Sequence, residues 1–154
     1  MADLRRFELF ASLLIERFPR VRSVFDVAGG QGRLNHALTQ RGLSCVTFDL
    51  RHKHLPVKFA MREFTLDEPC TADLIAGLHA DGATRIIIEY AAQHRVPFAV
   101  VPCCSDNSMP YKPWMRHLAG LARERGFTEV DEVTLPMQGR ARVIAGAFEP
   151  ASTP

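Results

Sequence analysis

A cluster of three glycines, Gly29, Gly30 and Gly32, is the stretch of this sequence best suited to bind a ligand through its backbone. Glycine has no Cβ, so its backbone turns tightly and lets a ligand approach closely. Residues 24–27 before the cluster are mostly apolar and β-prone, and residues 31–40 after it carry apolar side chains at helical spacing. A strand, a glycine turn and a helix open a βαβ unit, in which the turn and the free N–H groups of the helix bind nucleotides.

The spacing of the glycines does not fit a dinucleotide-binding turn. That turn has the sequence G-x-G-x-x-G, and Asn35 stands where its third glycine would be. The run from Asp26 to Gly32 instead resembles the acidic-x-G-x-G-x-G motif of class I S-adenosylmethionine-dependent methyltransferases. Ala28 replaces the first glycine of that motif, and Gly29 adds conformational freedom beside it. A structural glycine turn in another α/β protein is the alternative.

The resemblance implies S-adenosylmethionine as the cofactor and a set of residues that hold it. The turn Ala28–Gly32 is expected at the methionine end, with Asp26 near the ammonium group. Asp49 ends a second apolar stretch roughly 20 positions past the turn, where such folds hydrogen-bond a ribose; the alternative is a charged residue that merely ends a strand. The cofactor-binding residues expected from the resemblance are Asp26, Ala28, Gly29, Gly30, Gly32, Asp49, Leu50, Phe64 and Leu78.

Two further segments sharpen the resemblance. The segment 77–84, Gly-Leu-His-Ala-Asp-Gly-Ala-Thr, is followed by Val-Pro-Cys-Cys at 101–104. Together they resemble the group of methyltransferases that includes transfer-RNA 2′-O-methyltransferases with His-x-Cys-Gly and Cys-Cys segments. The resemblance covers roughly residues 24–105. Asp81 departs from it, because it stands in the place of the group's first cysteine.

Two polar residues follow the strand expected at 72–79 and are the candidate catalytic groups. An acceptor hydroxyl or amine must lose a proton as it is methylated, and His79 or Asp81 at the strand end is placed to accept it. The alternatives are a hydrogen-bonded pocket histidine for His79 and a helix N-cap for Asp81. Aligning the acceptor with the methyl group supplies much of the rate in any case.

The acceptor side of the site is expected to involve Cys103, Cys104, Tyr111 and Trp114. The aromatic residues lie in the loop after the strand at 97–102 and its following segment, where they would close over an acceptor; a loop folded on its own aromatics is the alternative. Adjacent cysteines rarely chelate one metal, and no C-x-x-C pair is present, so no metal site is expected.

The pattern of apolar residues predicts one α/β domain over residues 1–148, with a short disordered tail at 149–154. An N-terminal helix within residues 1–19 precedes a Rossmann-like class I methyltransferase sandwich, whose mostly parallel sheet closes with a C-terminal antiparallel hairpin. The expected strands are 24–27, 43–49, 62–66, 72–79, 97–102, 127–135 and 141–148, and the further helices are 31–40, 81–96 and 114–125.

The composition is that of an ordinary globular chain. It has 154 residues, is 47% hydrophobic and carries a formal net charge of +2. No stretch approaches the roughly 18 apolar residues of a membrane span, and the N-terminus lacks a signal-peptide pattern. The four cysteines show no disulfide framework, so a cytoplasmic, reduced protein is expected.

The small net charge of the chain indicates which class of methyl acceptor to expect. A nucleic acid held through its phosphates needs several cations on one face, and the candidates are few and scattered in sequence: Arg33, Arg51, Lys53, Lys58 and Lys112. A small-molecule or peptide acceptor is therefore favoured, with RNA as the alternative. A second alternative is a catalytically inactive, cofactor-binding subunit of a larger complex. The sequence makes no prediction of oligomeric state.

Overall fold

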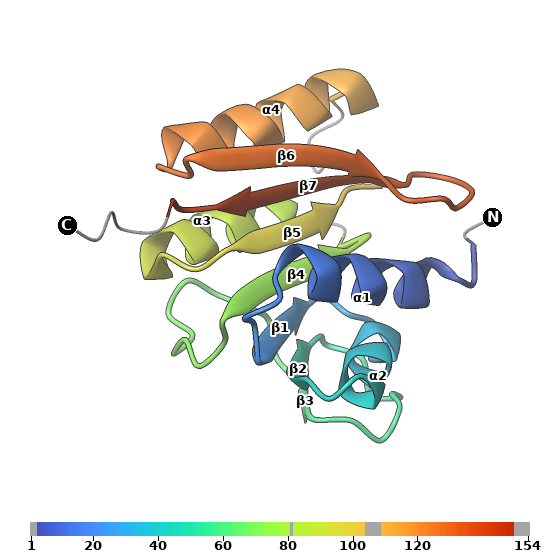
Figure 1. Ribbon diagram of the computed structural model, residues 1–154. Helices are drawn as coiled ribbons and strands as arrows, with labels where there is room; N and C mark the ends of the chain where they lie inside the picture. The colour runs from blue at the N-terminus through green and yellow to red at the C-terminus, as the bar shows by residue number, and fades with distance from the viewer. Residues whose placement is uncertain (1–2, 81, 104–108, 150–154) are drawn as a thin grey trace.

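The computed structural model describes residues 3–80, 82–103 and 109–149 and shows one mixed sheet between two layers of helices (Figure 1). The strands are β1 (Ser23–Val27), β2 (Ser44–Phe48), β3 (Phe59–Ala60), β4 (Leu74–Leu78), β5 (Phe98–Val101), β6 (Glu129–Thr134) and β7 (Arg142–Ala147). The helices are α1 (Arg6–Arg17), α2 (Arg33–Gln40), α3 (Thr84–His94) and α4 (Tyr111–Glu124).

The sheet has the order β3-β2-β1-β4-β5-β7-β6. The first five strands in that order are parallel, and β7 runs antiparallel to both β5 and β6. The order reverses between β1 and β4, so the carboxyl ends of these two strands form the crevice where open α/β sheets bind ligands. The predicted α/β sheet with a closing antiparallel pair is confirmed.

Each face of the sheet has its own apolar core. α1 and α2 cover one face, where Phe10 and Leu14 pack with Leu34 and Leu38. α3 and α4 cover the other face, where Ile87 and Leu118 join an aromatic cluster. Residues of β4 and β5 are buried throughout, because both faces of these central strands are covered.

The third strand lies earlier than predicted. Strand pairing ends at Ala60, whereas the sequence pattern placed the strand at 62–66. The backbone N–H groups of Thr47 and Asp49 donate to the carbonyls of Lys58 and Ala60, after which the chain turns away. Phe64 then inserts its ring against Phe48 with centroids 5.1 Å apart, so its apolar character reflects core packing rather than a strand.

Helix and chain boundaries also differ from the predicted ones. α3 begins at Thr84 rather than at residue 81, and Asp81 lies outside the described residues. α4 begins at Tyr111, three residues before the predicted start, because Pro113 is tolerated in the first turn of a helix. The N–H of Glu149 donates to Thr128 Oγ1, and the rest of the predicted tail lies outside the described residues.

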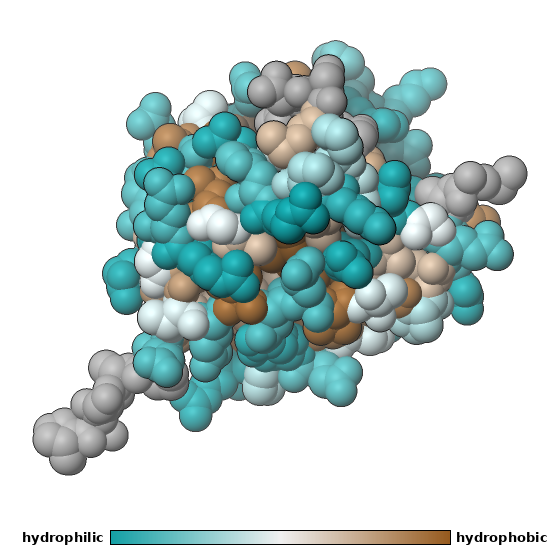
Figure 2. Space-filling view, turned by 90° about the horizontal axis from the view of Figure 1, so that it is seen from above, coloured by the Kyte–Doolittle hydropathy of each residue, from teal (hydrophilic) through white to brown (hydrophobic). Residues whose placement is uncertain are grey.

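Figure 2 views the molecule over α4 and β6 and shows a mostly hydrophilic face, on which apolar side chains form small, separate patches. None of the helices in the described part of the chain combines the length and the apolar character that a membrane crossing needs.

The packing of β7 against β5 requires glycine at position 146, because there is no room for a side chain there. Gly146 lies opposite Phe98, and a Cβ there would approach Phe98 Cε1 to 2.3 Å. We expect Gly146→Ala to lower the free energy of unfolding by about 1–3 kcal/mol through overpacking. Gly120→Ala in α4, where a Cβ meets nothing within 4 Å, should raise it by about 0.5–1 kcal/mol. Urea unfolding of both variants measures these changes, and equal behaviour of the two would contradict the packing argument.

Candidate functional site

The glycine turn follows β1 at the carboxyl edge of the sheet. Ala28, Gly30 and Gly32 all have positive φ angles, of 53°, 61° and 88°. The N–H of Gly32 closes the turn on the carbonyl of Gly29 at 3.1 Å, and α2 begins at the next residue. Ala28 adopts the left-handed conformation although it has a Cβ. This conformation is strained for alanine, so the surrounding structure must stabilise it.

Asp26 lies directly beneath this turn and is fully buried. Thr47 donates its hydroxyl to Asp26 Oδ2 at 2.9 Å, while Oδ1 has no hydrogen-bond partner in the described part of the chain. Burial raises the pKa of the carboxyl to about 7, against the opposing effect of the Thr47 hydrogen bond. A Cβ on Gly29 would lie 2.1 Å from Oδ2, so the backbone of Gly29 covers the carboxylate.

The buried position changes the expected role of Asp26. It exposes no surface, so it does not present the carboxylate to an ammonium group as the sequence suggested. Its structural work is to support the turn from below. Gly32 is also buried, and a Cβ there would meet Val57 Cγ2 at 2.7 Å. These two of the predicted cofactor-binding residues therefore shape the site without lining it.

Asp49 stands at the end of β2 beside the turn. Its carboxylate accepts hydrogen bonds from the N–H of Gly30 at 2.8 Å and of Arg51 at 3.1 Å. The side chain is half-buried and borders two cavities. These two hydrogen bonds hold the carboxylate at the edge of both cavities.

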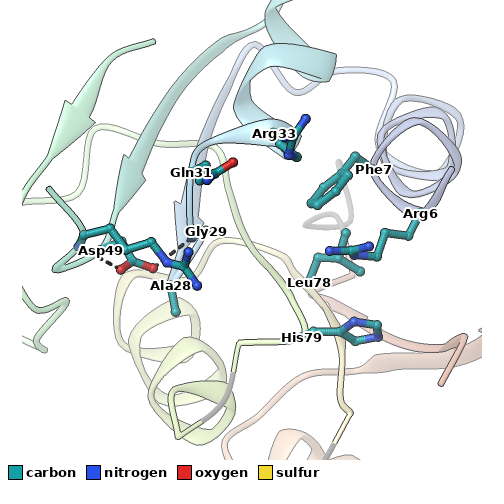
Figure 3. Close-up of a pocket in the computed structure, with 11 residues that line it drawn as sticks. Arg6, Phe7, Ala28, Gly29, Gln31, Arg33, Asp49, Leu78 and His79 are labelled. Atoms are coloured by element: carbon teal, nitrogen blue, oxygen red, sulfur yellow. Dashed lines mark hydrogen bonds between the residues drawn. The ribbon is translucent and has the colours of Figure 1, made fainter. Parts of the chain in front are cut away.

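Two cavities meet at Ala28 and Asp49. The first, of about 370 Å³, is mostly apolar and contains the predicted residues Leu50 and Phe64. The second, of about 380 Å³, contains the predicted residues Gly29, Gly30, Leu78 and His79 (Figure 3). The predicted residues are therefore brought together along one crevice at the carboxyl ends of β1, β2 and β4. Cavities of this size suit a small-molecule ligand.

The second cavity also has residues that the sequence analysis missed. They are Arg6 and Phe7 from α1. Arg33 and Arg51 also line this cavity, and the sequence had named them only as scattered cations. Figure 3 shows Arg6 and Phe7 across the open space from the glycine turn. The sequence predicted a helix before the first strand, and no local pattern indicates that the first turn of this helix reaches the site.

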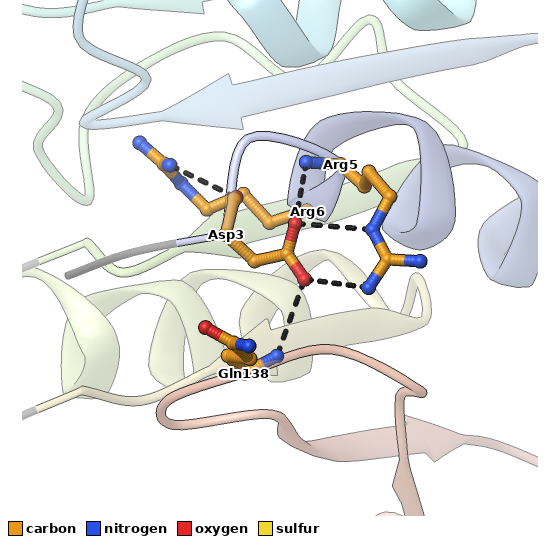
Figure 4. A network of polar contacts seen from close by, with 4 residues as sticks. All are labelled: Asp3, Arg5, Arg6 and Gln138. Carbon is orange, nitrogen blue, oxygen red and sulfur yellow. Dashed lines mark hydrogen bonds and ion pairs between the residues drawn. The ribbon is translucent and has the colours of Figure 1, made fainter.

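A network of hydrogen bonds holds the first turn of α1 in position. The Asp3 carboxylate accepts from the N–H and guanidinium of Arg5 and from the N–H of Gln138, and the Arg6 guanidinium donates to the Asp3 carbonyl (Figure 4). Hydrogen bonds from Arg5 hold the pKa of Asp3 well below its usual range. The network joins the start of α1 to the turn between β6 and β7.

His79 lies at the end of β4 with a positive φ of 53°. Its Nε2 is 2.8 Å from the carbonyl oxygen of Arg140. A carbonyl oxygen only accepts, so Nε2 carries the hydrogen, and Nδ1 of the neutral ring keeps its lone pair. The ring thus has a fixed orientation and one nitrogen able to accept a proton.

The predicted acceptor residues are not brought together. Tyr111 is half-buried and borders a separate cavity, with the Arg140 guanidinium 3.8 Å from its ring centroid. Trp114 is 2% exposed and packs in the core under α4, which does not fit its expected place in a loop over the acceptor. Cys103 is partly buried, and Cys104 lies outside the described residues. Within the described ranges, no cluster of side chains suits a metal ion.

The sheet order with its antiparallel β7, and the crevice at the glycine turn, are those of the class I S-adenosylmethionine-dependent methyltransferase fold. An O-methyltransferase family protein from Burkholderia thailandensis superposes with a TM-score of 0.59 and 19% identity, over 93% of this chain and 56% of that chain. A 1,6-didemethyltoxoflavin-N1-methyltransferase of the same organism, solved with bound 1,6-didemethyltoxoflavin and S-adenosylhomocysteine, superposes with a TM-score of 0.65 and 17% identity, over 94% of this chain and 79% of that chain.

One curated relative is similar in sequence. A probable tRNA (uracil-O(2)-)-methyltransferase of Caenorhabditis elegans is 25% identical over 158 residues. The match covers 82% of this chain and 28% of the relative, so the chain spans little more than a quarter of that protein. No family model matches the sequence.

The buried carboxyl of Asp26 predicts a pH-dependent stability. Its folded pKa of about 7 exceeds the unfolded value, so the folded state binds more protons between pH 4 and 7. The unfolding free energy from this group is therefore highest below pH 4 and falls by roughly 2–4 kcal/mol as pH rises through 7. Asp26→Asn should remove that slope, which urea unfolding of both proteins at several pH values measures. Parallel pH profiles would show that Asp26 is not protonated in the folded protein.

The His79 contact predicts a single imidazole tautomer. Nitrogen-15 NMR of the histidine rings should show Nε2 of His79 protonated and Nδ1 unprotonated in the neutral ring. The resonances are assigned by their loss in His79→Gln, with His36→Gln as a control on the exposed surface of α2. A mixture of tautomers at His79 would mean that the Arg140 carbonyl does not fix the ring.

Proposed function

We propose that this chain is an S-adenosylmethionine-dependent methyltransferase that methylates a hydroxyl or amine. The observation that carries the proposal is the crevice at the reversal point of the sheet, where a left-handed glycine turn and the Asp49 carboxylate meet two small-molecule cavities. The fold and the names of the similar proteins support the same cofactor and reaction.

The residues present fit this cofactor. The mostly apolar cavity beside Phe48, Leu50 and Phe64 suits an adenine ring, and Asp49 at its edge would accept hydrogen bonds from ribose hydroxyls. The other cavity carries Arg6 and Arg33, whose charges favour the carboxylate of a methionine chain. S-adenosylmethionine supplies a methyl group on a positively charged sulfur, which makes it a strong methyl donor.

His79 then has a defined task. With S-adenosylmethionine bound as methyl donor, methylation of a hydroxyl or amine would require the acceptor to lose a proton. Nδ1 of His79 can take that proton, since Nε2 is held by the Arg140 carbonyl. The rigid strand end and the glycine turn orient the two reactants across the cavity, which contributes to rate without further side-chain chemistry.

The comparisons leave two classes of acceptor. The toxoflavin enzyme is named for a small-molecule substrate and the curated relative for a tRNA. The sequence analysis favoured a small molecule or peptide because the cations of this chain are scattered along it. The placement of those cations in the fold is therefore the evidence that matters for this choice.

Binding of S-adenosylmethionine tests the proposal directly. Isothermal titration should show binding to the intact chain and none of comparable strength to NAD. Asp49→Asn should weaken binding about tenfold, since it removes the charge that accepts the ribose hydroxyls. Asp67→Asn, at an exposed position, is the matched control. The absence of S-adenosylmethionine binding at millimolar concentration would overturn the proposal.

A further inference from the structure

A third cavity, of about 640 Å³, lies between the first turn of α4 and the turn that joins β6 to β7. Three charged side chains line it, Lys112, Arg140 and Arg142, and all are positive. Lys112 and Arg140 form no ion pair within residues 3–80, 82–103 and 109–149, and Arg142 contacts Glu132 only at 4.0 Å. Cations left without carboxylate partners around a cavity favour an anionic ligand.

One of these cations is held in place. The Arg140 guanidinium lies over the Tyr111 ring, 3.8 Å from its centroid, and Tyr111 is anchored in the first turn of α4. Stacking restricts the guanidinium plane while leaving its N–H groups able to bind two oxygens of one anion. A planar fork of this kind matches phosphate better than a mobile lysine does.

The same residue connects this cavity to the methyl-transfer crevice. The Arg140 carbonyl accepts from His79 Nε2 at 2.8 Å, and His79 lines the cavity that also contains the glycine turn. One hydrogen bond therefore links a lining residue of the crevice to a lining residue of the third cavity.

The crevice side of this contact is also cationic. Arg6, Arg33 and Arg51 line the cavity around His79, and its single described carboxylate, on Asp49, already accepts two backbone hydrogen bonds. These arginines and the cations of the third cavity come from five separated parts of the sequence and line cavities at the same edge of the sheet. Because these cations are gathered in the fold, their separation in the sequence no longer favours a small-molecule or peptide acceptor over RNA.

We propose that the cavity between α4 and the β6–β7 turn binds a phosphate group of the methyl acceptor, with Arg140 as its principal ligand. The proposal rests on the proposed function, because it takes His79 to lie beside the reacting atom. The phosphate chemistry is shared by nucleotide chains and by small phosphorylated molecules, and the experiment separates these two sources.

Two probes are used with the cofactor site saturated by S-adenosylhomocysteine, so that neither probe is bound there. They are adenosine 5′-monophosphate and a short single-stranded RNA of mixed sequence, each followed by fluorescence anisotropy or calorimetry at increasing salt. Arg140→Gln and Lys112→Gln are compared with Arg123→Gln, which removes the same charge at the far end of α4. Binding of S-adenosylhomocysteine by each variant is measured first and should be unchanged.

We expect Arg140→Gln to weaken binding of at least one probe about tenfold, and Arg123→Gln to leave it within about twofold. If RNA binds, Arg140→Gln should also reduce the salt slope of its affinity by about one. If only the RNA binds, the phosphate belongs to a nucleotide chain. If the mononucleotide binds, the acceptor is a small phosphorylated molecule.

Two results would overturn the inference. One is that neither probe binds, and the other is that Arg140→Gln and Arg123→Gln have equal effects. Failure of the proposed function is seen separately, as absent binding of S-adenosylmethionine, and the RNA titration then runs without cofactor. If S-adenosylmethionine binds but neither phosphate-containing probe does, the methyltransferase proposal stands and the phosphate-binding proposal is refuted.

Discussion

A buried chain of hydrogen bonds under the glycine turn holds the site together. Asn35 in α2 reaches the Thr47 hydroxyl at 3.1 Å and the carbonyls of Cys45 and Lys58, and Thr47 donates to Asp26. This chain ties α2 to β2, to the segment before β3 and to β1. Because buried polar groups are costly without partners, the network resists distortion and fixes the turn above it. Asn35 thus explains why a third glycine is absent at its position.

The functional edge of the molecule follows from sheet topology. Parallel strands bring their carboxyl ends to one side, so the ends of β1, β2, β4 and β5 meet there whatever their separation in sequence. The turn between β6 and β7 reaches the same edge because β7 is antiparallel to β5. It carries Arg140, whose carbonyl orients His79 and whose guanidinium lies over Tyr111. One short turn therefore borders both the crevice and the cationic cavity.

Local sequence patterns predicted a helix, strand or turn correctly where its type depends on that one segment alone. The glycine cluster, the continuous apolar run of β5 and the helical spacing of α1 predicted the type and order of these elements, and the structure confirms them. The third strand was misplaced because Phe64 is apolar for reasons of core packing with Phe25 and Phe48, neither of which is near it in sequence. Trp114 was misjudged for the same reason, since the burial of a helix face depends on what packs against it.

The sequence by itself determined the fold class and the site of the ligand crevice, because backbone freedom at glycines and the periodicity of apolar residues are local properties. The spacing between the glycine turn and Asp49 also predicted that Asp49 lies at the end of a strand beside that turn. Only the tertiary structure decided that Asp26 lies buried under Gly29 and that the first turn of α1 closes the crevice. It alone gathered Arg6, Arg33, Arg51 and Arg140 at one edge. Side chains from distant segments add their charges where the fold brings them together, so the charge of this edge depends on tertiary packing.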